Sequence, residues 1–159
     1  MKRPVLLLIA ALLGASACST RYIGNTRIED TDENRAVLRV VEQYRRAVED
    51  RDVDRVLSLT SDSYFEDPGT PHIPGDDYDK AGLREKLESS FAKVQEHRLA
   101  IDVRRLRMND DEDEAAVDYR FDYRYRLDLP QAAQWREQND LNRLELRLEN
   151  GEWKIVSGL

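Results

Sequence analysis

Three carboxylates, Asp62, Glu66 and Asp67, stand close together in the sequence where an acid or a base could act. Residues 64–67 predict a short strand, so all three carboxylates lie in or near it. A carboxylate becomes a useful base near neutral pH when an apolar pocket raises its pKa. Carboxylates beside a short strand more often cap turns or face water. These three residues are therefore candidates for catalysis, but the sequence favours a protein that is not an enzyme.

A second group of side chains suits binding rather than reaction. Five tyrosines fall at positions where they could line one wall of a pocket, and their hydroxyls could orient a mostly apolar ligand. The alternative is that these rings are ordinary members of the core. The five candidate ligand-binding residues are Tyr44, Tyr64, Tyr119, Tyr123 and Tyr125.

Other catalytic signatures are missing from the sequence. His72 lies in a run rich in proline and glycine, and His97 opens a predicted strand, and both positions are typical of surface histidines. No nucleophile elbow, phosphate-binding loop, dinucleotide-binding glycine run or Cys/His metal spacing occurs. The acidic turn at 110–114 lacks the spaced ligands and the central glycine of a calcium loop. We therefore expect no cofactor and no metal.

The N-terminal residues predict export. Two basic residues precede an apolar stretch, residues 5–13, that is too short to span a bilayer, as in a secretory signal peptide. Small residues then stand directly before Cys18, the only cysteine. This segment resembles the lipobox of bacterial lipoproteins, although Ala15 stands where that motif usually has leucine. A lipid on Cys18 would also protect an otherwise exposed thiol from oxidation and mispairing.

This resemblance implies a division of the chain. Residues 1–17 would be a signal peptide, 18–31 a lipidated tether, and 32–159 one folded domain of ordinary size. By the sorting pattern of bacterial lipoproteins, Ser19 implies the outer membrane, with the domain facing the periplasm. Membrane contact would then be made only through the lipid. The alternative is ordinary cleavage, which would give a soluble periplasmic protein.

Composition limits the partners. The chain has 25 Lys and Arg against 32 Asp and Glu, a formal net charge of −7. An acidic balance disfavours nucleic acid as a partner. Charges of both signs are mixed along the chain, and 40% of the residues are hydrophobic, which indicates a globular domain rather than disorder. A small apolar ligand or an envelope protein remains as the expected partner.

Hydrophobic spacing predicts three helices in the first part of the domain. The first begins after Thr31, a suitable N-cap, and continues to about residue 50. A short second helix covers residues 53–60. The third follows Asp79, which is also a suitable cap. The chain then changes to the alternation that is typical of strands.

Long strands make up the second part of the domain. Residues 97–108 alternate, with a shift that indicates a bulge at 104–105. Residues 115–129 have the clearest alternation in the chain. Residues 131–140 show no readable pattern, and 143–157 predict a hairpin that turns at Asn-Gly. Long antiparallel strands with one apolar face need helices to cover that face, so the predicted class is α+β.

This order of elements resembles the nuclear transport factor 2-like superfamily, which includes ketosteroid isomerases and SnoaL-like proteins. The run at 40–59 and the closing run at 150–157 carry the resemblance. It implies a cone-shaped, curved antiparallel sheet packed against about three N-terminal helices around a cavity. It implies no particular activity, because the isomerases' combination of an inward tyrosine, an aspartate base and a second acid has no clear counterpart here.

We therefore interpret the chain as an exported lipoprotein whose domain is a non-enzymatic binding or accessory module of the cell envelope, with an aromatic-lined cavity. Two alternatives stay open. One is a small isomerase- or cyclase-like enzyme that uses a pocket carboxylate, and the other is a protein-docking module with a filled cavity. The outer face of the predicted sheet is highly charged and lacks the apolar area that obligate dimers bury, so we expect a monomer.

Overall fold

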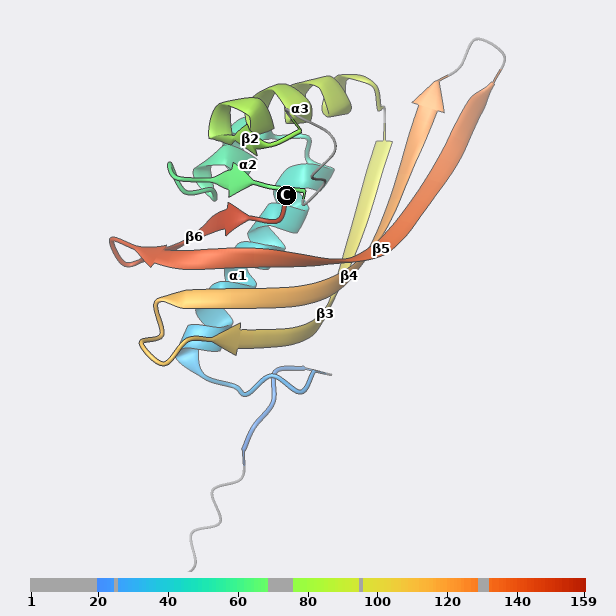
Figure 1. The fold of residues 1–159 in the computed structure, drawn as a ribbon. Coiled ribbons are helices and arrows are strands. Elements are labelled where there is room, and N and C mark those ends of the chain that lie inside the picture. Colours follow the sequence, from blue (N-terminus) through green and yellow to red (C-terminus); the bar gives the residue numbers. More distant parts are fainter. Residues whose placement is uncertain (1–19, 25, 69–75, 95, 129–131) are drawn as a thin grey trace, which may run out of the picture.

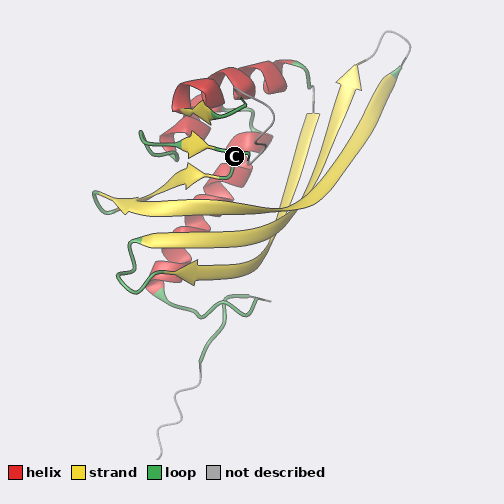
Figure 2. Ribbon diagram, in the orientation of Figure 1, coloured by secondary structure: helices red, strands yellow, loops and turns green. Residues whose placement is uncertain are grey.

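Three helices pack on one side of a strongly curved antiparallel sheet (Figures 1 and 2). The structure is a computed structural model, and the predicted signal peptide and Cys18 lie outside the residues that it describes. Within the described ranges, no helix is long and apolar enough to cross a membrane. The described residues are 20–24, 26–68, 76–94, 96–128 and 132–159.

The three predicted helices are confirmed, and their starts follow from capping. The Thr31 hydroxyl accepts a hydrogen bond from the backbone N–H of Asn34 at 3.1 Å, which satisfies a free donor of the first turn. Asp79 accepts from the N–H groups of Ala81 and Gly82, each at 3.0 Å. The helices are α1 (Asp32–Glu49), α2 (Val53–Ser58) and α3 (Lys80–Ala92).

Four strands form the main sheet in sequence order, and every neighbouring pair is antiparallel. They are β3 (Glu96–Met108), β4 (Glu114–Asp128), β5 (Ala133–Glu149) and β6 (Glu152–Ser157). A separate two-stranded sheet joins β1 (Phe65–Glu66) to β2 (Tyr78–Asp79). The α+β class and the curved antiparallel sheet are thereby confirmed.

Two local predictions in the sheet are confirmed as well. The pairing of β3 with β4 shifts between Val103 and Arg105, where the alternation predicted a bulge. Asn150 and Gly151 have positive φ angles of 52° and 84°, as the turn between β5 and β6 requires. The start of β5 was not predicted, because side chains 133–143 are exposed on both faces of the sheet and therefore need no alternation.

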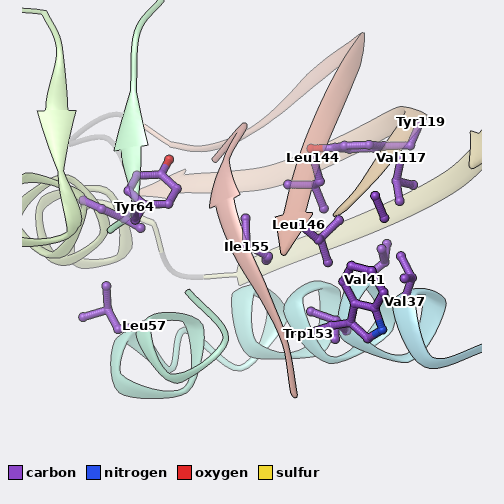
Figure 3. Packing of buried hydrophobic residues seen from close by; sticks show 13 residues of the cluster. Val37, Val41, Leu57, Tyr64, Val117, Tyr119, Leu144, Leu146, Trp153 and Ile155 are labelled. Atoms are coloured by element: carbon purple, nitrogen blue, oxygen red, sulfur yellow. The ribbon is translucent and has the colours of Figure 1, made fainter. Parts of the chain in front are cut away.

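The main core lies between α1 and the concave face of the sheet (Figure 3). Trp153 of β6 is only 9% exposed and belongs to the same cluster as Val37 and Val41 of α1. Leu144 and Leu146 of β5 are buried with it. Leu148, which the alternation also placed inward, is 40% exposed.

The segment before α1 is partly ordered by its own contacts. Tyr22 and Glu29 form an isolated antiparallel bridge, and the N–H of Ile23 donates to the carbonyl of Ile28 at 2.9 Å. The side chain of Ile28 is buried. Part of the predicted tether therefore packs on the domain rather than extending away from it.

Candidate functional site

A cavity of about 190 Å³ lies between α1 and the concave face of the sheet. Aromatic and aliphatic side chains make up most of its lining, and the final two residues of the chain close part of it. Its lining residues are Tyr44 and Val48 of α1, Leu99 of β3, Tyr119, Phe121 and Tyr123 of β4, Asn142 of β5, and Gly158 and Leu159.

Regular secondary structure brings these residues together. The two residues from α1 are four positions apart and so share one face of the helix. Tyr119, Phe121 and Tyr123 are alternate residues of β4 and so share one face of the sheet. Across the sheet, Leu99 pairs with Tyr123, and Asn142 pairs with Tyr119. Helix and strand periodicity together make an aromatic wall opposite α1.

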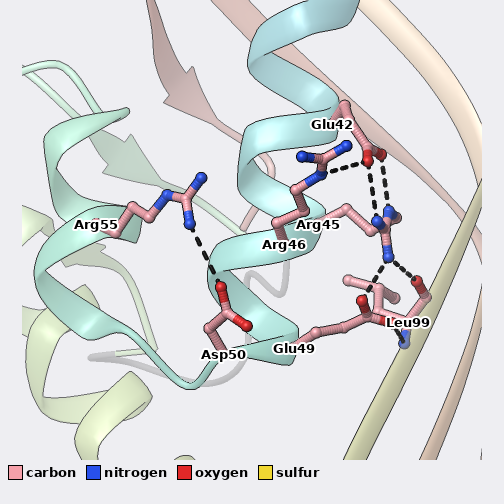
Figure 4. Close-up of polar contacts among 7 residues, drawn as sticks. All are labelled: Glu42, Arg45, Arg46, Glu49, Asp50, Arg55 and Leu99. Carbon is pink, nitrogen blue, oxygen red and sulfur yellow. Dashed lines mark hydrogen bonds and ion pairs between the residues drawn. The ribbon is translucent and has the colours of Figure 1, made fainter.

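An ionic cluster holds α1 at a fixed place beside this wall (Figure 4). The N–H of Leu99 donates to Glu49 Oε1 at 3.0 Å, and Arg45 Nη1 donates to the Leu99 carbonyl at 3.4 Å. Arg45 also pairs with Glu49 at 2.5 Å and with Glu42 at 2.7 Å. The hydrogen bond from Arg45, with help from Arg46, lowers the pKa of Glu42 to about 2. These contacts also cover the sheet edge at Leu99, where another chain could otherwise pair.

Glu66 fixes the opposite side of the cavity. Its Oε2 atom accepts hydrogen bonds from the N–H of Gly158 at 2.6 Å, the N–H of Leu159 at 3.3 Å and the Tyr64 hydroxyl at 2.9 Å. Asn142 Nδ2 donates to the Gly158 carbonyl at 3.2 Å. The carboxylate of Glu66 therefore positions the backbone that forms this wall.

Three phenol hydroxyls belong to the cavity lining. Burial raises the pKa of Tyr119 and of Tyr123 to about 12, and the Asn142 side chain acts against this shift at Tyr119. Burial also raises the pKa of Tyr44 well above its usual value. All three are uncharged at neutral pH and keep one donor and acceptor lone pairs. Among the described residues, no hydrogen-bond partner is found for the Tyr44 hydroxyl.

His97 is partly buried beside the cavity, whereas the sequence indicated a surface position. Its Nδ1 atom makes a short hydrogen bond with the Tyr123 hydroxyl. The Phe91 ring and the imidazole form a T-shaped pair, with ring centroids 5.4 Å apart and an interplanar angle of 89°. The contact was missed because the alternation of β3 gives the face of His97 but not the approach of α3 to it.

Solved structures with the same arrangement of elements were found at low sequence identity. A ketosteroid isomerase-like protein from Erwinia carotovora atroseptica is 18% identical, with a TM-score of 0.64 over 80% of this chain and 94% of that one. A proposed dehydratase of the nuclear transport factor 2-like family from Streptomyces avermitilis is 14% identical, with a TM-score of 0.62 over 79% and 93%. The chain has the nuclear transport factor 2-like fold. No family model and no curated protein matches it.

A third structure with the nuclear transport factor 2-like fold is a proposed aromatic ring hydroxylase from Novosphingobium aromaticivorans. It is 18% identical, with a TM-score of 0.64 over 77% of this chain and 83% of that one. These three neighbours carry different activity names on one architecture. The likeness therefore establishes the fold alone, and a function for this chain must come from its own cavity.

The nuclear transport factor 2-like fold separates the five predicted tyrosines. Tyr44, Tyr119 and Tyr123 line the cavity. Tyr64 is buried under the chain end, where its hydroxyl bonds Glu66. Tyr125 stacks on Tyr123 with ring centroids 5.2 Å apart and lies outside the cavity lining. The structure therefore brings three of the five candidates into one space.

The three predicted carboxylates are not among the cavity-lining residues. Asp62 is exposed and forms an ion pair with Lys80 at 2.9 Å. Asp67 is exposed at the end of β1. Glu66 lies nearest to the cavity, and its charge contributes to the raised pKa of Tyr119. A catalytic role for any of them stays a prediction.

Several lining residues were missed in the sequence. Asn142 follows the stretch that had no readable pattern, and Gly158 and Leu159 stand at the chain end without a motif. Val48 was assigned only to the core face of its helix.

His72, the other histidine, lies outside the described residues. Within the described ranges, no group of three or more His, Cys, Asp or Glu is placed to hold a metal ion.

Proposed function

We propose that the domain is a non-enzymatic module that binds a small, mostly apolar molecule between α1 and the sheet. The observation that supports this proposal is the cavity of about 190 Å³ with an aromatic and aliphatic lining. An apolar protein cavity of about 150 Å³ is sufficient to hold benzene. A ligand of about one ring therefore fits, with a polar group directed at the tyrosine hydroxyls.

The contacts of Glu66 weigh against the alternative of an isomerase- or cyclase-like enzyme. A base must be free to take a proton from the substrate. Glu66 Oε2 instead accepts from the N–H groups of Gly158 and Leu159 and from the Tyr64 hydroxyl. Glu66 is also absent from the cavity lining, so a ligand in the cavity would not meet this carboxylate directly. The cavity itself weighs against the other alternative, a docking module with a filled interior.

A cavity-filling substitution tests the proposal with toluene as the probe. We expect toluene to raise the melting temperature of the wild-type domain, because a ligand that binds only the folded state stabilises it. Val48→Phe places a ring in the cavity and should abolish this increase. Overpacking can itself cost about 1–3 kcal/mol, so each variant is compared with its own ligand-free melting temperature.

Val103→Phe is the matched control for this experiment. Val103 is partly buried on β3 and packs against the main core, but it does not line the cavity. This variant should keep the increase caused by toluene. The proposal is wrong if toluene has no effect on the wild type, or if both variants respond as the wild type does.

We also propose that Cys18 carries a lipid that anchors a monomeric domain in the cell envelope, on the periplasmic side of the outer membrane. The single cysteine after small residues and a short apolar stretch supports this proposal. In bacteria that express the full chain, labelled fatty acid should enter the wild type and not Cys18→Ser. Equal labelling of both proteins, or release of unlabelled wild-type protein into the periplasm, would contradict it.

A further inference from the structure

The outer edge of β5 is open to another strand along residues 135–141, which we call the free edge. We propose that a second copy of this chain pairs with the free edge, so that two folded monomers meet reversibly as antiparallel strands. This contact differs from an obligate dimer through the charged outer face of the sheet, which the sequence disfavours. It goes beyond the proposed ligand binding and does not depend on it.

The two edges of the main sheet differ in what covers them. Glu49 and Arg45 of α1 bond the backbone of Leu99 and cover the edge at β3. β6 covers only residues 145–149 of β5. Before them, no described strand pairs with the outer side of β5, whose side chains are exposed throughout 133–143. The ends of β4 and β5 also project beyond the helices (Figure 1), so this edge is a template for another strand.

The pairing with β4 fixes which backbone groups of β5 point outward. The N–H of Leu148 donates to the carbonyl of Asp113 at 2.8 Å, on the side of β4. The register between β4 and β5 has no shift, and in an antiparallel strand the N–H and C=O of one residue point to the same side. Even-numbered residues of β5 therefore face β4, and odd-numbered residues direct their backbone groups to the outer edge.

The outward groups of the free edge lack a second strand. Trp135, Glu137 and Asn139 direct theirs outward, and their N–H groups have no hydrogen-bond partner within the described part of the chain. The outward N–H of Leu141 bonds only the side chain of Asp140, at 2.8 Å. A second strand can therefore form the hydrogen bonds of an antiparallel ladder along this edge.

The free edge is complementary to itself in one register. In a symmetric pair, outward residues meet outward residues only if the two-fold axis passes through a residue. An axis at Gln138 places Trp135 opposite Leu141 of the other copy, and Arg136 opposite its Asp140. Trp135 and Leu141, 53% and 71% exposed, are the most exposed large apolar side chains of β5. An axis at any other residue makes neither match.

Arg136 and Asp140 are available for such a contact. Within the described ranges neither belongs to an ion pair, because Arg136 donates to Gln134 at 3.1 Å and Asp140 accepts from the N–H of Leu141. Opposite charges at directly opposed positions stabilise strand pairs, and like charges destabilise them. The two-fold axis forms this ion pair twice, once on each side of Gln138.

The contact is short, so it is weak. Interfaces that bury less than about 1,200 Å² are typical of transient complexes. A dissociation constant of about 1 mM leaves the lipid-free domain monomeric at about 10 μM. Two copies held on one membrane surface meet at a much higher effective concentration. The free edge therefore suits association of anchored copies, whereas the dilute domain remains a monomer.

Cross-linking through a single cysteine tests the register. Residues 20–159 contain every buried residue of the described core and no cysteine, so Gln138→Cys supplies the only thiol of this domain. On the axis this residue meets its own copy at a position without mutual backbone hydrogen bonds, where the Cα atoms lie about 4.5 Å apart and a disulfide can form. At about 1 mM protein under mild oxidation, we expect disulfide-linked dimers to form at least about tenfold faster than with Gln134→Cys. Gln134 is the matched control, because it is exposed on the same face but lies opposite Asn142 of the other copy rather than opposite itself.

A charge reversal separates a specific pair from random collision. In the Gln138→Cys background, Asp140→Arg places arginine opposite Arg136 and should reduce cross-linking to the rate of the control. Adding Arg136→Asp restores opposite charges and should restore the faster rate. Both positions are exposed, and unchanged melting temperatures check that the variants stay folded. Equal rates for Gln138→Cys and Gln134→Cys, or no recovery in the double charge reversal, would overturn the inference and leave the free edge to a strand of another protein.

Discussion

Replacing Trp153 by alanine is expected to destabilise the domain by about 3–5 kcal/mol, the usual cost of truncating a buried tryptophan. Trp153 is 9% exposed, and β6 contacts α1 through the core cluster to which it belongs. The indole is also the partner of Leu148 across the β5–β6 hairpin. Its loss therefore weakens both the hairpin and its attachment to the helix.

Urea denaturation measures this effect, and the other tryptophan provides the control. Trp135 is 53% exposed on β5, so Trp135→Ala should change the free energy of unfolding by no more than about 0.5 kcal/mol. Domains of this size are stable by about 5–15 kcal/mol, so the Trp153 variant is unfolded only if the stability of the wild type lies at the lower end of this range. Equal midpoints for the two variants would show that Trp153 is not a core anchor.

The difference between the two tryptophans illustrates what the sequence could establish. Trp153 follows an Asn-Gly turn and shares its face with Ile155, so local alternation predicted its burial. Trp135 lies in the part of β5 whose side chains are exposed on both faces, where no periodic pattern is required. Periodicity detects a strand only when one of its faces is covered.

The candidate site shows the same limit. Alternation along β4 placed Tyr119, Tyr123 and Tyr125 on one face, and that is correct. Alternation does not indicate which part of β4 is covered by α1 and the chain end. Tyr125 was therefore grouped with the residues that line the cavity. Whether Glu66 is a base or a structural acceptor depends on contacts with residues more than 90 positions away. Such contacts have no local signature.

The second large effect is expected from Gly158→Ala, because the backbone leaves no room for a side chain. Gly158 has a φ of +98°, and an added Cβ would lie 1.9 Å from the carbonyl oxygen of Arg143. A strained backbone conformation alone destabilises the folded state by about 1–3 kcal/mol, and the clash between the added Cβ and the Arg143 carbonyl destabilises it further. The segment that Glu66 holds must therefore move, which opens the cavity wall. We expect a loss of stability of more than about 2 kcal/mol together with a loss of toluene binding.

Gly151→Ala separates backbone strain from the clash. Gly151 also has a positive φ, +84°, but an added Cβ would meet nothing within 4 Å. Gly151→Ala should lower the free energy of unfolding by only about 1–2 kcal/mol, the cost of holding alanine in the left-handed conformation. Toluene should still bind to this variant. Urea denaturation compares the free energies of unfolding of the two variants. The rise in melting temperature that toluene causes in each variant compares their binding. If Gly158→Ala costs no more than Gly151→Ala and still binds toluene, the chain end can move without changing the cavity, and the contacts of Glu66 do not maintain its wall.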